Sequence, residues 1–159
     1  MKNKFYLLII IIAVAILSFV TNFNNKKQVT KILPEITLVS IYNNQPISLK
    51  FPNKFILQLF ATWCEKCNEY NHELKQMIKA SNLTIPIFGI AIKDNDEYLH
   101  RQYDNKSPFV DIANDNRGFI LAELGIRAIP ETIFVKDNII VKRILGGASQ
   151  KDIIDFSND

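Results

Sequence analysis

The stretch "TWCEKC", residues 62–67, holds every cysteine of this chain, because the 159-residue sequence has only two. The two thiols, Cys64 and Cys67, directly follow residues 55–60, "FILQLF", an almost unbroken apolar run typical of a strand buried on both faces. A helix is predicted next, because apolar residues recur from Cys67 onward at spacings of three and four. Open α/β sheets carry their functional sites at the carboxyl ends of strands, so the two cysteines lie where a functional site is expected.

The predicted start of this helix makes the two thiols unequal. Thr62 is a predicted helix cap, and Glu65 three residues later completes a capping-box pattern. This places Cys64 in the first turn, where free backbone N–H groups and the helix dipole stabilise a thiolate. Cys67 lies one turn further on, within the apolar stripe. We therefore expect an exposed attacking thiol at Cys64 and a shielded resolving thiol at Cys67.

Two other uses of the cysteines are less well supported by the sequence. A disulfide that closes so few residues removes little loop entropy from the unfolded chain, so it is a poor structural staple. A metal site needs more ligands than two thiolates, and the only histidines, His72 and His100, lack metal-ligand spacing to the pair. Copper(I), which accepts two thiolates, stays open. Reversible thiol–disulfide exchange is the favoured interpretation.

The rest of the pattern predicts one α/β domain over residues 33–159. The expected elements are short strands at 36–41 and 47–51, a second buried strand within 84–92, helices at 94–103 and 119–124, a hairpin of strands 131–135 and 139–145, and a last helix at 149–156. A strand–helix–strand unit followed by an antiparallel hairpin indicates a mixed β-sheet flanked by helices, preceded by a β-hairpin extension.

The N-terminus predicts a membrane anchor. Residues 5–20, "FYLLIIIIAVAILSFV", carry no charge and span roughly 24 Å as a helix, against about 30 Å for a bilayer core. No small-residue cleavage site follows, which favours an uncleaved anchor over a cleaved signal peptide. We expect a single transmembrane helix within residues 1–24 and a polar linker at 25–32. The short basic tail before it favours a cytoplasmic N-terminus with the rest of the chain exported.

The net charge of +3 does not indicate an anionic partner. Four of the 19 basic residues flank the apolar segment, which leaves 15 against 16 acidic residues in the remainder. Those four are Lys2, Lys4, Lys26 and Lys27. Because no basic stripe interleaved with aromatic residues is present, nucleic-acid binding is not expected.

Several motifs together resemble one family. "FATWCEKC" after an apolar strand, "GIAIKDN" at residues 89–95 and "GIRAIPETIFV" at residues 125–135 resemble the thioredoxin fold. More closely, residues 33–147 are similar to the membrane-anchored thiol–disulfide oxidoreductases of cytochrome c maturation, CcmG/DsbE, and to the related ResA and TlpA proteins. The motif Gly-Ile-x-x-x-Pro-Glu-Thr is the most specific pointer to the CcmG branch.

The resemblance implies further site residues. It implies that Ile129-Pro130 is a cis peptide bond facing the cysteines, with the backbone of Ile129 available to a bound peptide. It makes Glu131 part of the substrate groove, although a surface position on an edge strand is equally compatible with the sequence. Trp63, beside the attacking thiol, is expected to form an apolar rim for the partner. No metal site is expected.

The chain departs from the family at positions that move protons. Tyr70 stands where an acid often follows the second cysteine, with Glu69 one step around the helix. Gln58 lies where thioredoxins carry a buried acid. Between the cysteines, Glu65 and Lys66 have opposing charges, so the reduction potential stays open.

The resemblance implies a disulfide reductase of the bacterial inner membrane whose domain faces the periplasm. Its expected substrate is the disulfide of apocytochrome c, or of another exported protein, and a membrane thiol reductase is the expected electron donor. No dissociable cofactor is required. Alternatives are a reductase for a copper-site protein of an oxidase, a copper(I) carrier that uses the same CxxC, and an oxidant.

Overall fold

A mixed β-sheet organises the molecule, which we describe from a computed structural model covering residues 31–47, 53–104 and 107–159. Within these residues, six strands pair in the order β1-β8-β7-β4-β5-β6. The parallel half of the sheet contains β4 (Lys54–Phe60), β5 (Ile87–Ile92) and β6 (Asp111–Asp115). The antiparallel half contains β7 (Glu131–Lys136), β8 (Ile139–Leu145) and β1 (Lys31–Ile32).

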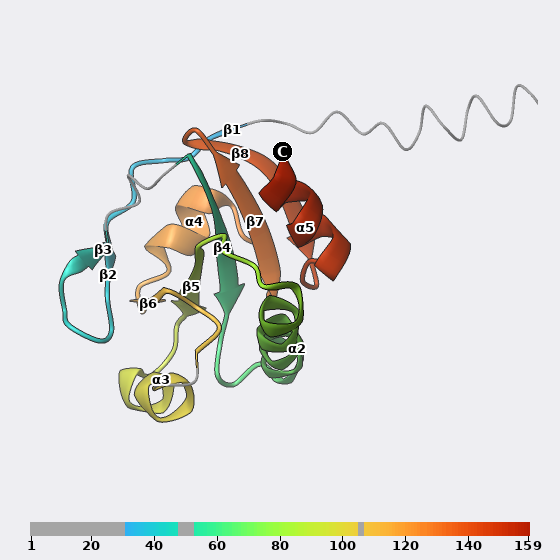
Figure 1. Ribbon diagram of the computed structural model, residues 1–159. Coiled ribbons are helices and arrows are strands. Elements are labelled where there is room, and N and C mark those ends of the chain that lie inside the picture. Colours follow the sequence, from blue (N-terminus) through green and yellow to red (C-terminus); the bar gives the residue numbers. More distant parts are fainter. Residues whose placement is uncertain (1–30, 48–52, 105–106) are drawn as a thin grey trace, which may run out of the picture.

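Helices cover both faces of this sheet. The helices are α2 (Glu65–Ser81), α3 (Asp96–Tyr103), α4 (Phe119–Leu124) and α5 (Gln150–Asn158). Figure 1 shows α4 on one side of the sheet and α2 with α5 on the other. Two buried clusters follow from this arrangement: one contains Ile120 and Leu124 of α4, and the other contains Cys67 of α2 and Ile153 of α5.

The central strands are buried because their side chains are apolar on both faces. In β4 every residue from Phe55 to Phe60 is buried, and in β5 all six residues are buried. Alternation sends Leu57 and Leu59 into the α4 cluster and Ile56 and Phe60 into the α2 cluster. The two apolar runs in the sequence are therefore the two central parallel strands, as predicted.

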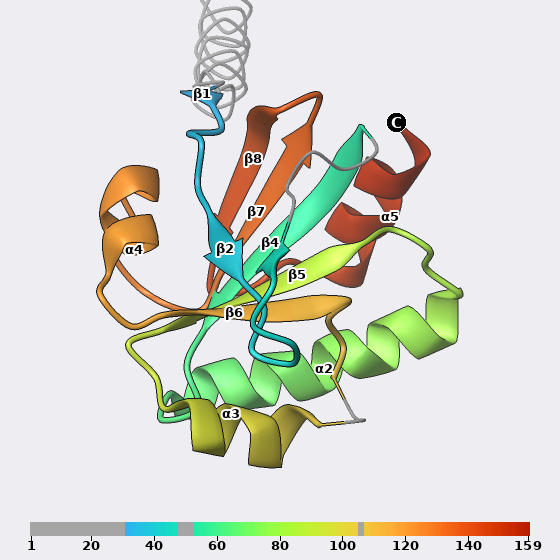
Figure 2. The same ribbon diagram turned by 90° about the vertical axis from the view of Figure 1, so that its left-hand side faces the viewer.

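The N-terminal extension lies on the α4 side of the sheet (Figure 2). A short hairpin pairs β2 (Leu38–Val39) with β3 (Pro46–Ile47), in the register Leu38 to Ile47. It reaches β6 through a bridge between Ser40 and Ala113. The predicted hairpin is confirmed, although its strands are shorter than expected; residues 48–52 lie outside the described part of the chain.

The strand β6 was not predicted from the sequence. Its sequence, "DIAND", buries Ile112, Ala113 and Asp115. β6 pairs with β5 along one edge and meets Ser40 along the other. A strand at the edge of a sheet can be rich in polar residues. The polar residues of β6 therefore hid the apolar pattern by which a strand is predicted from sequence. The expected order of elements therefore lacked one parallel strand between α3 and α4.

The predicted anchor at residues 1–24 lies outside the described residues. None of the helices in the described part of the chain has both the length and the apolar character needed to cross a bilayer. Lys31 and Ile32, expected to belong to the linker, form β1 and pair with Ile140 and Ile139 of β8.

Candidate active site

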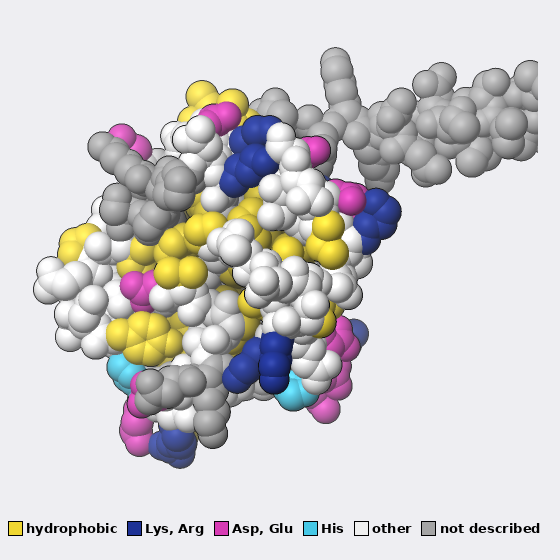
Figure 3. Space-filling view, viewed as in Figure 1, with side chains coloured by type: hydrophobic (Ala, Val, Ile, Leu, Met, Phe, Trp, Pro, Cys, Tyr) yellow, Lys and Arg dark blue, Asp and Glu magenta, His cyan; other side chains and the backbone are white. Residues whose placement is uncertain are grey.

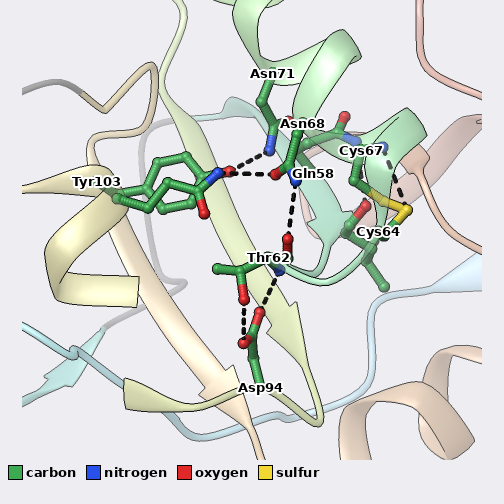
Figure 4. Close-up of a disulfide and its surroundings, with 10 residues drawn as sticks. Gln58, Thr62, Cys64, Cys67, Asn68, Asn71, Asp94 and Tyr103 are labelled. Carbon is green, nitrogen blue, oxygen red and sulfur yellow. Dashed lines mark hydrogen bonds between the residues drawn. A yellow bond between two sulfur atoms is a disulfide. The ribbon is translucent and has the colours of Figure 1, made fainter. Parts of the chain in front are cut away.

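The two cysteines form a disulfide at the point where β4 ends and α2 begins (Figure 4). Their Cα atoms are 5.2 Å apart. β4 positions the pair because it lies between β5 and β7 in the sheet and is hydrogen-bonded to both. The site is therefore built on one central strand and the first turn of one helix.

Cys64, rather than Thr62, caps α2. Cys64 is the N-cap residue, with extended backbone angles of φ −96° and ψ 105°, and its Sγ accepts a hydrogen bond from the Cys67 N–H at 3.2 Å. The predicted Thr62 cap is wrong because the Thr62 hydroxyl donates to Asp94 instead, at 2.6 Å. Cys64 thus lies just before the helix. Its sulfur still lies at the N-terminal end of the helix, where the N–H groups of the first turn and the positive end of the helix dipole favour a thiolate.

The predicted difference in exposure between the two cysteines is confirmed. Cys67 is fully buried in the cluster that includes Tyr70 and Leu74, whereas Cys64 is half-buried. Trp63 is 65% exposed beside them, and its Nε1–H points to the Lys93 carbonyl at 3.4 Å. Cys64 is therefore the more accessible of the two residues, while Cys67 is shielded. The binding role of Trp63 stays a prediction.

The Ile129-Pro130 peptide bond is cis, as the resemblance implied. It directly precedes β7, and the Pro130 carbonyl accepts a hydrogen bond from Gly146 N–H at 2.8 Å. Half-buried Ile129 packs against the cluster that contains both Cys64 and Cys67. The fold thus places Ile129 and the cysteines on one cluster, although contact between Ile129 or Pro130 and a substrate stays a prediction.

Glu131 is neither an edge-strand residue nor an exposed one. β7 lies between β4 and β8, and Glu131 is only 7% exposed. Its carboxylate accepts a hydrogen bond from Arg143 Nε at 2.7 Å, and Arg143 also donates to the Leu124 carbonyl of α4. Because neighbouring residues of a strand face opposite sides, Glu131 points toward α4 while Thr132 points toward α2. Its expected place in a substrate groove stays a prediction.

No family model matches the chain. A probable thiol:disulfide interchange protein DsbE-2 from Pasteurella multocida is 27% identical over 89 residues, covering 55% of this chain and 45% of that protein. The thiol:disulfide interchange protein DsbE from Vibrio cholerae is 25% identical over 104 residues, covering 65% of this chain and 50% of that protein. The chain spans about half the length of the curated relatives it matches.

The fold is similar to that of a solved structure. The secreted thiol-disulfide isomerase from Corynebacterium glutamicum superposes with a TM-score of 0.67 at 18% identity, covering 85% of this chain and 95% of that one. At this identity the match establishes the thioredoxin-like fold alone. In sequence, the chain is similar to thiol:disulfide interchange proteins of the DsbE type.

A buried polar network lies on the α2 side of the sheet, and it adds Thr132 and Ala148 to the positions that the sequence singled out. Gln58 is fully buried, and its Oε1 accepts a hydrogen bond from the Thr132 hydroxyl at 2.6 Å. The backbone N–H of Ala148 donates to Tyr70 Oη at 2.9 Å, and the Tyr70 hydroxyl points to the Ala148 carbonyl at 3.1 Å. Burial raises the pKa of Tyr70, so its hydroxyl is neutral at pH 7. The network therefore joins the neutral groups that replace the acids expected at positions 58 and 70.

Thr132 was detectable in principle. It is two residues from Pro130 on a predicted strand, so alternation places it on the same face as Pro130. A threonine among the apolar residues of a central strand needs a polar partner.

Charged side chains on the surface of the domain are mixed in sign. On the face shown in Figure 3, Lys and Arg side chains are scattered among Asp, Glu and apolar side chains.

Within the described residues, no three His, Cys, Asp or Glu side chains are grouped so that they could hold a metal ion. His72 is exposed and pairs with Gln76 at 2.8 Å.

Proposed function

We propose that this chain is a thiol–disulfide oxidoreductase that reduces disulfides in exported proteins. The observation that carries the proposal is the unequal pair: a half-exposed Cys64 whose sulfur accepts an N–H, next to a fully buried Cys67. The thiolate is the nucleophile in disulfide exchange, and this environment favours it at Cys64. The DsbE relatives, named as thiol:disulfide interchange proteins, support the same chemistry.

The reaction proceeds in two exchanges. The Cys64 thiolate attacks one sulfur of the partner's disulfide, forms a mixed disulfide and releases the partner's other sulfur as a thiol. The Cys67 sulfur then attacks Cys64 Sγ, closes the Cys64–Cys67 disulfide and releases the second partner thiol. Two electrons and two protons pass from the cysteine pair to the partner. The two sulfurs carry the electrons, so the exchange needs no dissociable cofactor.

The proposed setting is the bacterial inner membrane, with residues 1–24 as a single-pass anchor and the domain facing the periplasm. Apocytochrome c is the proposed client, reduced so that haem can attach, and a membrane thiol reductase is the proposed electron donor. The resemblance to CcmG/DsbE and the apolar segment at residues 5–20 support this setting.

Trapping the mixed disulfide tests the reaction. The variant Cys67→Ser keeps the attacking thiol and removes the resolving one, so a partner protein should remain covalently bound to Cys64. The measurement is a non-reducing gel followed by identification of the trapped protein by mass spectrometry. The matched variant Cys64→Ser should trap no partner.

Trapping only through Cys67 would reverse the assigned roles. Stoichiometric copper(I) binding without any disulfide reduction would instead support a copper carrier. A reduction potential more oxidising than that of the partner's disulfide would make the chain an oxidant. To identify the client, c-type haem is measured in a deletion strain with and without an added thiol reductant. Loss that the reductant rescues supports apocytochrome c, whereas loss of an oxidase copper centre alone points to a copper-site protein.

A further inference from the structure

One carboxylate holds the segment that leads into Cys64. Asp94, half-buried in the loop after β5, accepts two hydrogen bonds from Thr62: the backbone N–H donates to Oδ2 at 2.5 Å and the hydroxyl donates to Oδ1 at 2.6 Å (Figure 4). Both carboxylate oxygens are thus directed at a single residue. Thr62 is two positions before Cys64 and follows the end of β4 by two residues.

A second side chain holds the same residue from the opposite direction. Asn68 Nδ2–H donates to the Thr62 carbonyl at 2.8 Å, and Asn68 Oδ1 in turn accepts from Gln102 of α3 at 2.8 Å. The N–H, hydroxyl and carbonyl groups of Thr62 are therefore all engaged. A residue whose three polar groups are all hydrogen-bonded has little rotational freedom. Because only Trp63 separates Thr62 from Cys64, the backbone of Cys64 is restrained as well.

Asp94 is itself fixed to the sheet. Asn114 of β6 donates to the Asp94 carbonyl at 2.9 Å, and the next residue, Asn95, caps α3 by accepting the Tyr98 N–H. The Asn95 N–H also donates to Asp94 Oδ1 at 2.8 Å. Support from β5, β6 and α3 gives the carboxylate a defined position from which to orient Thr62.

The restraint matters because the geometry of Cys64 is narrow. Its sulfur meets the Cys67 N–H only while the residue keeps the extended backbone of an N-cap. We propose that Asp94 is a positioning residue for Cys64: through Thr62 it holds the backbone in the N-cap conformation, so that the Cys64 thiolate of the reduced protein keeps its hydrogen bond from the helix. The inference rests on the proposed attacking role of Cys64.

The negative charge of Asp94 and its hydrogen bonds to Thr62 should have opposite effects on the reactivity of Cys64, which makes the proposal testable. A negative carboxylate near a thiolate disfavours that thiolate, so a purely electrostatic Asp94 would make Cys64 less reactive. A positioning Asp94 makes Cys64 more reactive. Asp94→Asn removes the charge and keeps both bonds to Thr62, since the amide oxygen can accept the Thr62 N–H while the amide N–H donates to the hydroxyl oxygen. It gives up only the bond that Oδ1 accepts from the Asn95 N–H. Asp94→Ala removes both the charge and the bonds.

The experiment measures alkylation of Cys64 by iodoacetamide in the reduced full-length chain, kept in detergent, across a range of pH. Peptide mass mapping assigns the modified cysteine. We expect Asp94→Ala to slow alkylation near pH 6 by about threefold or more, because its rate–pH profile moves to higher pH by about half a unit. Asp94→Asn should retain the parental rate within about twofold, because it keeps the hydrogen bonds to Thr62 without the charge.

A second pair of variants tests the same link from the other side. Thr62→Val loses the hydroxyl bond to Asp94 and should slow alkylation, whereas Thr62→Ser keeps it and should not. This pair also decides the matter if Asp94→Ala fails to fold. Asp152→Ala removes a comparable carboxylate from the start of α5 and should lower the melting temperature without moving the profile.

Four results would overturn the proposal: an unchanged profile in Asp94→Ala, equal shifts in Asp94→Ala and Asp94→Asn, equal behaviour of the two Thr62 variants, or an equal shift in Asp152→Ala. The readout needs no partner protein. If the expected shifts appear but no mixed disulfide is ever trapped, the proposed function fails while the positioning role of Asp94 stands.

Discussion

At the scale of single residues, Cys64 and Cys67 show how three positions along a chain can separate two identical side chains chemically. The helical spacing puts Cys67 on the apolar stripe of α2, and the structure buries it completely. Cys64 precedes the helix and accepts an N–H from its first turn. The difference in environment is what divides the pair into an attacking and a resolving thiol in the proposed reaction.

Gly147 allows the backbone to pass close to the ring of Tyr70, which packs in the same cluster as Cys67. A Cβ atom added there would lie 2.4 Å from two ring carbons of Tyr70, and the backbone φ of +96° is strained for any other residue. Gly146 has a similar φ of +89°, but a Cβ atom there would meet nothing within 4 Å. The two glycines therefore share the backbone requirement and differ only in the space around them.

We predict that Gly147→Ala destabilises the protein by about 1–3 kcal/mol more than Gly146→Ala, because the methyl group displaces the Tyr70 ring. Urea unfolding followed by circular dichroism measures the difference. Both variants bear the strain of a positive φ, so that cost cancels in the comparison. Equal destabilisation of the two would show that Tyr70 yields to the methyl group without cost.

At the scale of elements, the parallel pairing of β4 with β5 creates the Asp94–Thr62 contact. Leu59 is in register with Ile90, and Phe60 with Ala91, so the segments after the two strands emerge side by side. Thr62 and Asp94 follow their strands by two residues each. The contact between Thr62 and Asp94 could have been predicted from the sequence, because polar residues that follow adjacent parallel strands meet at one edge of the sheet.

The helix α5 is tied to the sheet by one carboxylate. Asp152 accepts the Ser149 N–H in a capping box and forms an ion pair with Lys142 of β8 at 2.6 Å. The hydrogen bond from Lys142, followed by that from Ser149, lowers the pKa of Asp152 to about 2. Because the folded-state pKa lies below its ordinary value, the stabilisation is present above about pH 4 and is lost as the pH falls through about 2.

We therefore predict that Asp152→Asn destabilises the protein by about 1 kcal/mol near neutral pH, and that the difference from the parent shrinks as the pH falls from about 4 to about 2. Thermal unfolding across this range measures it. Asp155→Asn is the matched control, since the Asp155 carboxylate forms an exposed pair with Lys151 on the same helix. A difference between Asp152→Asn and the parent that stays constant down to pH 2 would contradict the linkage.

At the scale of the whole molecule, the N-terminal extension completes one of the two cores. Leu33, Leu38 and Ile47 are buried in the cluster that also contains the α4 residues. Val39, next to Leu38 in the same short strand, is 48% exposed, whereas Leu38 is 1% exposed. The extension thus belongs to the folded domain and does not merely connect it to the predicted anchor.

We predict that Leu38→Ala costs about 2–5 kcal/mol of unfolding free energy, because it opens a cavity between the extension and the sheet. Val39→Ala, on the opposite face, should change the stability by about 0.5 kcal/mol or less. Chemical denaturation of the two variants provides the measurement. If both changes were equally mild, the extension would have to detach without disturbing the α4 cluster.

Much of the fold could be predicted from the sequence because its signals are local. The apolar runs of β4 and β5, the stripe on α2 and the turn before β8 each depend on a few consecutive residues. Asp137 and Asn138 in that turn both have positive φ, as such residues tolerate. β6 escaped prediction because an edge strand with three polar residues has no local apolar pattern.

The sequence by itself determined the cysteine pair, its place at a strand end and the burial of Cys67, since helical spacing and apolar runs are properties of neighbouring residues. Only the tertiary structure decided which residue caps α2, where Glu131 points and what holds Thr62. Those outcomes depend on Asp94 and Arg143, which lie 32 and 12 residues from the groups they bond. Competition between such distant partners is settled by geometry, because a hydrogen bond forms only where folding brings donor and acceptor within reach.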